Sequence, residues 1–137
     1  MNFTAIDYSL TWFKQHYDGT VPKRRGGKFV VLQEKMHIYM LFCPIQQAEY
    51  HANIVALFTQ ERKLSGHYND KRDVYHLTAE QWQIQGGGHW LLDEEAHLLR
   101  LYGRSMAYGT VSELARLIPA LKTSQVFAVE DIVCSAS

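Results

Sequence analysis

Cysteine is scarce in this chain of 137 residues, and neither sign of charge is in excess. The two cysteines, Cys43 and Cys134, lie far apart and form no CxxC pair, so neither a disulfide framework nor a zinc cluster is expected. Free thiols are typical of a reducing compartment and predict a cytoplasmic protein. The 14 basic and 14 acidic residues cancel, so the overall basic field of a nucleic-acid-binding protein is missing and no nucleic-acid partner is expected.

Long apolar runs are missing as well, and no segment approaches the roughly 18 consecutive apolar residues that a membrane-spanning helix needs. The N-terminal segment carries Asp7 and has no apolar centre, so it is not expected to be a signal peptide. What the chain does contain is ordinary globular composition, with 47% hydrophobic and 20% charged residues, which allows a core to form. We therefore predict a single domain over residues 1–137 with no membrane partner.

Apolar and β-branched segments predict much of the chain to be strands. Residues 1–18 show a pattern that does not decide between a helix and a strand. Residues 20–27 (TVPKRRGG) combine proline, glycine and charge and are predicted to be a loop. The first two strands are separated by a short link and are expected to form a hairpin. The predicted strands are residues 28–33, 37–43, 82–85, 89–92, 98–102 and 125–133.

Two other segments have the spacing of apolar residues that is typical of helices. The first spans residues 46–64. The second begins at Thr110, because Thr110 and Glu113 have the spacing of a capping box, and Pro119 is expected to end or kink it because proline lacks a backbone amide. In sequence order these elements predict an α/β (α+β) fold with a single mixed sheet of about six strands flanked by two main helices.

The segment between the strand at 98–102 and the predicted helix start at Thr110 is a candidate anion site. Free amides and the positive end of the helix dipole would point to the same place there. Ser105 adds a hydroxyl, the small Ala107 allows close approach of the backbone, and Arg104 could add charge. The alternative interpretation is an ordinary tight turn before a helix.

Histidine offers one further candidate. His51 lies near the start of the first predicted helix, where a lone histidine is more often a core or surface residue than a catalyst. The seven histidines show neither HxxxH nor HExxH spacing, so no metal site is expected. The run Gly86-Gly87-Gly88-His89 could cradle phosphate, but a bulge or bend in a sheet is the simpler interpretation. Lys28 and the run Lys23-Arg24-Arg25 are expected to be solvated charges.

Three strings occur in one order and carry a family resemblance: AEYHANI at 48–54, GGGH at 86–89 and YGRSMAYG at 102–109. They resemble the AEYHADI, GGGR and YGYSMAYG blocks of the Janus/Ocnus family of phosphohistidine phosphatases. The strand KFVVL at 28–32 is similar to the family's first core strand, which begins with a phosphate-pairing lysine. The resemblance covers roughly residues 26–130 and leaves residues 1–25 outside it as a variable N-terminal extension.

The resemblance implies a phosphatase that hydrolyses the P–N bond of phosphohistidine or related phosphoramidates without a metal or other cofactor. His51 matches the family's essential histidine, a general base or nucleophile. Lys28 matches the lysine that helps to hold the substrate, and Ala52 would add a backbone amide. The implied partner is a phosphohistidine-containing protein or a small phosphoramidate. The remaining phosphate contacts are implied for the loop of Ser105, Met106 and Ala107.

Two positions depart from the family pattern. His89 stands where the family has an arginine after the three glycines, and Arg104 stands where it has an aromatic residue. Arg104 could compensate for the missing guanidinium, because arginine can make planar contacts with phosphate from either place. His89 remains a further candidate for substrate binding. The other interpretations are a changed substrate, or lost activity in a protein that binds phosphoproteins or regulates other proteins on the same fold.

Overall fold

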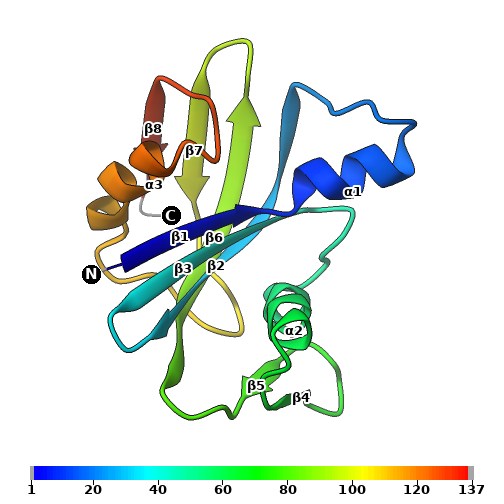
Figure 1. Ribbon diagram of the computed structural model, residues 1–137, viewed down its shortest axis with the longest axis vertical. Coiled ribbons are helices and arrows are strands. Elements are labelled where there is room, and N and C mark those ends of the chain that lie inside the picture. Colours follow the sequence, from blue (N-terminus) through cyan, green and yellow to red (C-terminus); the bar gives the residue numbers. More distant parts are fainter. Residues whose placement is uncertain (1, 136–137) are drawn as a thin grey trace.

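The computed structural model describes residues 2–135, which form one mixed sheet of six strands and a small sheet of two (Figure 1). This range also contains three α-helices, so the predicted α+β fold with a mixed six-stranded sheet is confirmed, with one helix more than expected. The large sheet has the order β1-β3-β2-β6-β7-β8. Its strands are β1 (Asn2–Asp7), β2 (Arg24–Glu34), β3 (His37–Pro44), β6 (Trp82–Asp93), β7 (Leu98–Tyr102) and β8 (Asp131–Cys134). The helices are α1 (Ser9–His16), α2 (His51–Glu61) and α3 (Ile118–Ser124), with the 3-10 helix η1 (Leu114–Leu117) before α3, and the small sheet is β4 (Gly66–Tyr68) with β5 (Tyr75–Leu77).

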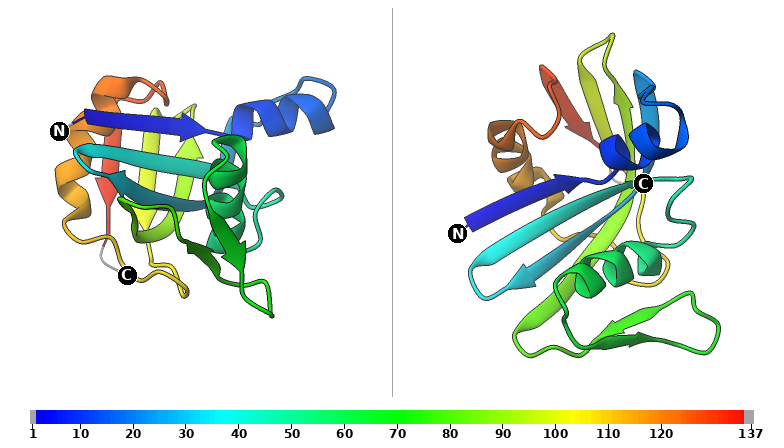
Figure 2. Two further views of the ribbon diagram at one scale, coloured as in Figure 1. Left: turned by 60° about the horizontal axis from the view of Figure 1, so that its bottom comes forward. Right: turned by 45° about the vertical axis from the view of Figure 1, so that its right-hand side comes forward.

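The large sheet separates two apolar cores, and α2 and α3 lie on its opposite sides (Figure 2). Val30 and Leu32 of β2 point into the core that α2 covers. Their neighbours Phe29 and Val31 point into the other core, which contains Leu121 of α3. Successive side chains of a strand alternate between faces, so the unbroken apolar run of β2 is explained by cover on both sides.

The N-terminal segment, whose pattern was ambiguous, contains both a strand and a helix. β1 pairs in parallel with β3 along its whole length, from Asn2 opposite His37 to Asp7 opposite Phe42. Helix α1 follows directly after Tyr8. This part of the chain, which the family resemblance does not reach, therefore supplies an edge strand of the main sheet.

Strand β2 begins at Arg24, so the loop predicted over residues 20–27 is wrong in its second half. Gly26 and Gly27 suggested a turn, but both pair with β6, and Gly27 lies opposite Trp90. A Cβ atom on Gly26 would lie 2.5 Å from the carbonyl oxygen of Trp90. The glycines therefore permit the close approach of two backbones. Glycine serves this purpose as well as forming turns, and the sequence alone does not distinguish the two.

The basic run at 23–25 is not a free cationic patch. Arg25 is only 7% exposed, and its guanidinium lies 3.6 Å from the carboxylate of Asp7. Arg24 Nε lies 3.1 Å from a carboxylate oxygen of Asp93. A guanidinium is buried only where carboxylates or other acceptors replace water, so the expectation of solvated charges is wrong for Arg25.

The three glycines lie inside β6 and do not divide it into two strands, so that prediction is wrong. The pairing of β2 with β6 shifts here, because Val31 lies opposite Gly86 and Leu32 lies opposite Ile84. Gln85 is thus the extra residue of a β-bulge, and Gly86 has a φ of +139°, which side chains rarely allow. The interpretation of this run as a bulge is confirmed.

Helix α2 is shorter than the predicted range of 46–64 and begins at His51. The residues between Pro44 and the helix form turns. Tyr50 is extended, with φ −120°, and its amide donates to Asn53 Oδ1 at 2.8 Å. This contact satisfies a backbone amide beside the helix start and fixes where the helix begins. His51 is consequently the first residue of α2, at the end of the helix where free amides lie.

The helix predicted from Thr110 does not form there. Gly109 accepts a hydrogen bond from the amide of Gly87 at 3.0 Å, which holds this segment beside β6. Glu113 is left-handed, with φ +56°, so regular helical structure begins only after it, in η1 and then α3. A four-residue capping pattern predicts a helix start only where the backbone is free to turn, and here tertiary pairing prevents it.

Pro119 lies in the first turn of α3 and neither ends nor kinks a helix. Amides in a first turn have no acceptor within the helix, so the missing amide of proline costs nothing at this place. Helix α3 continues to Ser124, and β8 is therefore later and shorter than the predicted strand at 125–133. Among the helices of residues 2–135, none is both long and apolar enough to cross a membrane.

Candidate functional site

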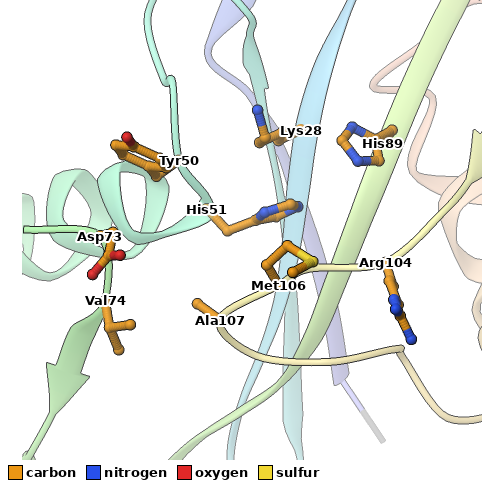
Figure 3. A pocket seen from close by; sticks show the side chains of 9 residues that line it. All are labelled: Lys28, Tyr50, His51, Asp73, Val74, His89, Arg104, Met106 and Ala107. Atoms are coloured by element: carbon orange, nitrogen blue, oxygen red, sulfur yellow. The ribbon is translucent and has the colours of Figure 1, made fainter.

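A cavity of about 290 Å³ lies where the start of α2 meets β2, β6 and two loops (Figure 3). Its lining combines residues that the sequence suggested with others that it did not. The first group is Lys28, His51, His89, Arg104, Met106 and Ala107, and the second is Tyr50, Asp73 and Val74. A cavity that gathers polar side chains from distant parts of a chain is the default candidate for a functional site.

His51 is held by two consecutive glycines of β6. Its Nε2 atom lies 2.8 Å from the carbonyl oxygen of Gly88. A carbonyl oxygen only accepts, so Nε2 carries the hydrogen and the neutral ring keeps its lone pair on Nδ1. The ring fits because Gly87 has no side chain, since a Cβ atom there would lie 2.8 Å from His51 Cδ2. The glycine run thus fixes both the position and the tautomer of His51.

Burial keeps the His51 imidazole neutral. The residue is only 5% exposed. Burial lowers the pKa of His51 from 6.5 to about 4, with His89 and Lys28 acting in the same direction and the hydrogen bond to Gly88 opposing them. Loss of hydration penalises the charged form, so the ring is unprotonated at neutral pH. His51 is therefore available there as a base or as a nucleophile through Nδ1.

Lys28 and His89 lie directly opposite each other on β2 and β6, so their side chains share one face of the sheet. Lys28 Nζ donates to the carbonyl oxygen of Glu49 at 2.7 Å, just before α2. The ring centroids of His51 and His89 are 5.6 Å apart. Burial, and then the charge of Lys28, lower the pKa of His89. This residue therefore does not replace the fixed charge of the arginine that the family has here.

Two predicted phosphate contacts lie outside the cavity lining. Ser105 is 1% exposed, and its Oγ accepts a hydrogen bond from the amide of Tyr108 at 3.0 Å. Its backbone also pairs with Gly109 in both directions. The hydroxyl therefore shapes the loop and does not face the cavity. The side chain of Ala52 is fully buried in the core beneath α2, so only its backbone could serve a ligand.

The anion site expected from a helix beginning at Thr110 is not formed, because no helix begins there. The helix start that does reach the cavity is that of α2, through Tyr50 and His51. The positive end of that helix dipole favours an anion, and it also disfavours a proton on His51. The sequence thus predicted a helix start at Thr110, whereas the helix start that lines the cavity is that of α2.

Tyr108 ties the loop at 104–109 to the small sheet. Its hydroxyl donates to the carbonyl oxygen of Tyr75 and accepts from the amide of Tyr75, both at 2.8 Å. Burial raises the pKa of Tyr108 to about 12, so the hydroxyl keeps its hydrogen. The strand β5 in turn brings Asp73 and Val74 to the cavity. No spacing in the sequence indicated this wall, because it depends on a contact between residues far apart in the chain.

Lys28, His51 and His89 surround one space in Figure 3, whereas the side chain of Arg104 points away from it. Arg104 is exposed, and Met106 beside the cavity is 90% exposed. The hypothesis that Arg104 compensates for the missing family arginine therefore needs a change of its side-chain conformation on binding. In this arrangement Lys28 is the permanent cation nearest to His51.

The composition of the lining suits a small anion. Lys28 and Arg104 are permanent cations, and Asp73 is the one carboxylate of the cavity lining, on a different wall (Figure 3). Within residues 2–135, no three histidine, cysteine or acidic side chains come together in the way that metal ligands do. A neutral imidazole beside a cation can take a proton from water or act as a nucleophile toward a bound anion.

Comparison of the sequence with models of protein families gives no match, and a search of curated proteins gives none either.

Proposed function

We propose that this protein is a metal-independent phosphatase of the Janus/Ocnus type that hydrolyses the P–N bond of phosphohistidine in proteins or of related phosphoramidates. The observation that carries the proposal is a buried, neutral His51 whose Nε2 is committed to Gly88, whose Nδ1 has no hydrogen-bond partner within residues 2–135, and which lines one cavity with Lys28. The strings that resemble the family supply two of these residues and the glycine run. The resemblance and the local chemistry therefore support the same reaction.

His51 has two routes to hydrolysis. As a general base, Nδ1 takes a proton from water while the water oxygen bonds to phosphorus and the P–N bond breaks. As a nucleophile, Nδ1 itself bonds to phosphorus, the substrate nitrogen leaves with a proton, and water then cleaves the phosphorylated His51. In both routes the ring becomes positively charged, and the hydrogen bond from Nε2 to Gly88 stabilises that charge.

Lys28 would neutralise charge on the phosphoryl oxygens, with the start of α2 beside it. Phosphoryl transfer needs mainly positioning and charge stabilisation from the protein. The leaving nitrogen of phosphohistidine departs readily once it is protonated. Hydrolysis of phosphohistidine therefore needs less stabilisation of the leaving group by the protein than hydrolysis of a serine phosphate. The small cavity with few cations therefore favours phosphoramidate substrates over phosphate esters.

A catalytically inactive phosphoprotein-binding or regulatory module on this fold is the second candidate function. Three observations favour it, namely the hydroxyl of Ser105 turned into its loop, the side chain of Arg104 pointing away from His51, and His89 in place of an arginine. Each leaves fewer groups to stabilise a transition state. A module of this kind would bind a phosphorylated protein through Lys28 without releasing phosphate.

The deciding experiment measures phosphate release from phosphoramidate and from a phosphohistidine peptide in the presence of EDTA. The wild-type protein is compared with His51→Gln, in which the amide can still donate to Gly88 but cannot act as a base. Turnover that survives EDTA and falls by about a thousandfold or more in His51→Gln is the expected result. Binding of the peptide without turnover by the wild type contradicts the proposal and favours the binding module.

The two routes are separated by rapid quenching into alkali, where phosphohistidine is stable. Phosphate bound to the wild-type protein, and absent from His51→Gln, identifies His51 as the nucleophile. No bound phosphate during steady turnover identifies it as the general base.

A further inference from the structure

Apolar side chains are exposed on the face of the large sheet that carries Lys28 and His89. Leu91 of β6, Tyr102 of β7 and Val133 of β8 are 46%, 40% and 43% exposed. Directly paired residues of neighbouring strands project from the same face. The pairing therefore produces two parallel rows on this face, here called the open face: Lys28, His89 and Tyr102 form the first, and Gly26, Leu91, Arg100 and Val133 form the second.

The open face is unusual for an interior part of a sheet. Single exposed apolar residues are common, but contiguous ones on neighbouring strands mark sites of interaction. Helix α2 covers the same side of the sheet farther along β2, over Val30 and Leu32, and leaves these rows uncovered. The exposed rows thus begin where the cover of α2 ends, which is also where the candidate site lies.

The charge of the open face has one sign. Its two rows contain Lys28 and Arg100 and no carboxylate. The next row contains two carboxylates, Asp93, which lies 3.1 Å from Arg24, and Asp131 at its β8 end, so the positive charge is confined to these two rows. Arg100 is exposed and forms no ion pair with another residue in the range 2–135. A partner surface that carries a carboxylate beside apolar side chains would therefore complement this face.

The face also has a hollow that could take a side chain. A cavity of about 340 Å³ lies beside Leu91, Leu98 and Arg100. It is next to the second row, and the first row contributes Lys28 and His89 to the candidate site. Residues two positions apart on a strand are about 7 Å apart and project from the same side, so an extended peptide whose phosphorylated residue enters the site would place its second and fourth neighbours over Leu91 and Arg100.

We propose that the open face docks the segment of a phosphoprotein substrate that flanks the phosphorylated residue, with an acidic residue on Arg100 and an apolar residue against Leu91. This inference rests on the proposed function, because it takes the cavity at His51 as the reaction site. The preferred substrates are then extended peptide segments of partner proteins, and free phosphoramidates are poorer ones.

The test compares three substrates, namely phosphoramidate and two short peptides with a central phosphohistidine. One peptide has leucine and aspartate two and four positions from the phosphohistidine, which project from one side of an extended chain, and the other has serine and lysine there. The variants are Arg100→Glu and Leu91→Ser. Their matched controls are Lys122→Glu on α3, on the other side of the sheet, and Met36→Ser in the turn between β2 and β3.

The expected result is that the wild type prefers the acidic peptide and that each variant lowers kcat/KM for that peptide by about tenfold. Phosphoramidate turnover should stay within about twofold, because it does not reach the face, and both controls should behave as wild type. The proposal is overturned if the wild type has the same kcat/KM for the two peptides. It is also overturned if a folded variant loses kcat/KM equally for the acidic peptide and for phosphoramidate.

Failure of the proposed function has a different signature. If the wild type hydrolyses none of the three substrates, the Kd for the acidic peptide decides the question of the face. A Kd that Arg100→Glu raises by about tenfold supports it, and an unchanged Kd overturns it. The remaining alternative is that the open face binds a second copy of this chain, which sedimentation equilibrium tests. If the wild type is a dimer, and Arg100→Glu dissociates it without changing the Kd for the peptide, the face belongs to the dimer and the proposal is overturned.

Discussion

The Nε2 atom of His51 lies 2.8 Å from the carbonyl oxygen of Gly88, so the first residue of α2 is joined to the glycine run of β6. This contact determines which nitrogen carries the hydrogen and leaves the lone pair of the neutral ring on Nδ1. It also explains why AEYHANI and GGGH, which are distant in the sequence, belong to one site. The predictions below follow from this contact and from the groups that support it.

Gly87→Ala is expected to lower kcat by about 10- to 100-fold, because small displacements of a catalytic group have effects of that size. The new Cβ atom would lie 2.8 Å from His51 Cδ2 and 2.5 Å from the carbonyl oxygen of Phe29, so the ring must move. Phosphoramidate kinetics measure the effect, with circular dichroism as the check of folding. Gln15→Ala is the control, because Gln15 is exposed on α1, outside the cavity lining. Wild-type kinetics in a folded Gly87→Ala protein would contradict the placement of His51.

The pH dependence of kcat/KM should have its acid limb near pH 4. Burial lowers the pKa of His51 from 6.5 to about 4, so the free base persists well below neutral pH and activity is lost as pH falls through about 4. The measurement follows phosphoramidate hydrolysis between about pH 3.5 and 8, with the uncatalysed rate subtracted at each point. An acid limb centred near 6.5 would mean that the ring is more hydrated than this structure has it.

The same pKa shift predicts a loss of stability in acid. The folded pKa of His51 is lower than the unfolded one, so the unfolded chain binds the extra proton first, and stability falls as pH decreases from about 6.5 to about 4. The free energy of unfolding should fall over this window by up to about 3 kcal/mol more in wild type than in His51→Gln. Urea denaturation at both ends of the window measures it. Parallel curves for the two proteins would refute the assignment to His51.

Tyr108→Phe is expected to destabilise the protein by about 1–3 kcal/mol, because the amide and carbonyl of Tyr75 both lose their partner. The loop at 104–109 should become less ordered, and KM for phosphoramidate should rise by a few fold while the pH profile stays unchanged. Thermal unfolding and steady-state kinetics measure the two effects. Tyr17→Phe is the control, because Tyr17 is 51% exposed on the surface after α1. A shifted acid limb in Tyr108→Phe would indicate that this tyrosine acts on His51 and not on the loop.

The central strands could be predicted because their signal is local. Residues 29–32 are apolar on both faces, which is the pattern of a strand that is covered on both sides. The candidate residues were found through three unusual strings and the strand at 28–32, and the cavity brings together five candidates from the strings and Lys28 from the strand. Ser105 was found in the same way, but the string could not show that its hydroxyl bonds to Tyr108 within the loop.

Two of the errors concern segments whose state depends on a distant partner. Thr110 and Glu113 have the spacing of a helix start, but the contact of Gly109 with Gly87 holds this segment beside β6. Gly26 and Gly27 resemble a turn, but they let β2 and β6 approach. Glycine permits several conformations, so the neighbouring strand determines which one is adopted.

The sequence by itself determined an α+β fold with a mixed sheet, the apolar strands of its centre, and the candidate site residues. The fold and the strands follow from hydrophobic periodicity, which acts over a few residues, and the candidate residues follow from strings that resemble a family. The tertiary structure decided that the N-terminal segment pairs with β3, that α2 begins at His51, and that Gly88 accepts from Nε2. The strand pairing and the contact of His51 depend on backbone groups more than thirty residues away along the chain, which hydrogen-bond only after the chain has folded. The helix start depends on the local contact of the Tyr50 amide with Asn53, which hydrophobic periodicity does not report.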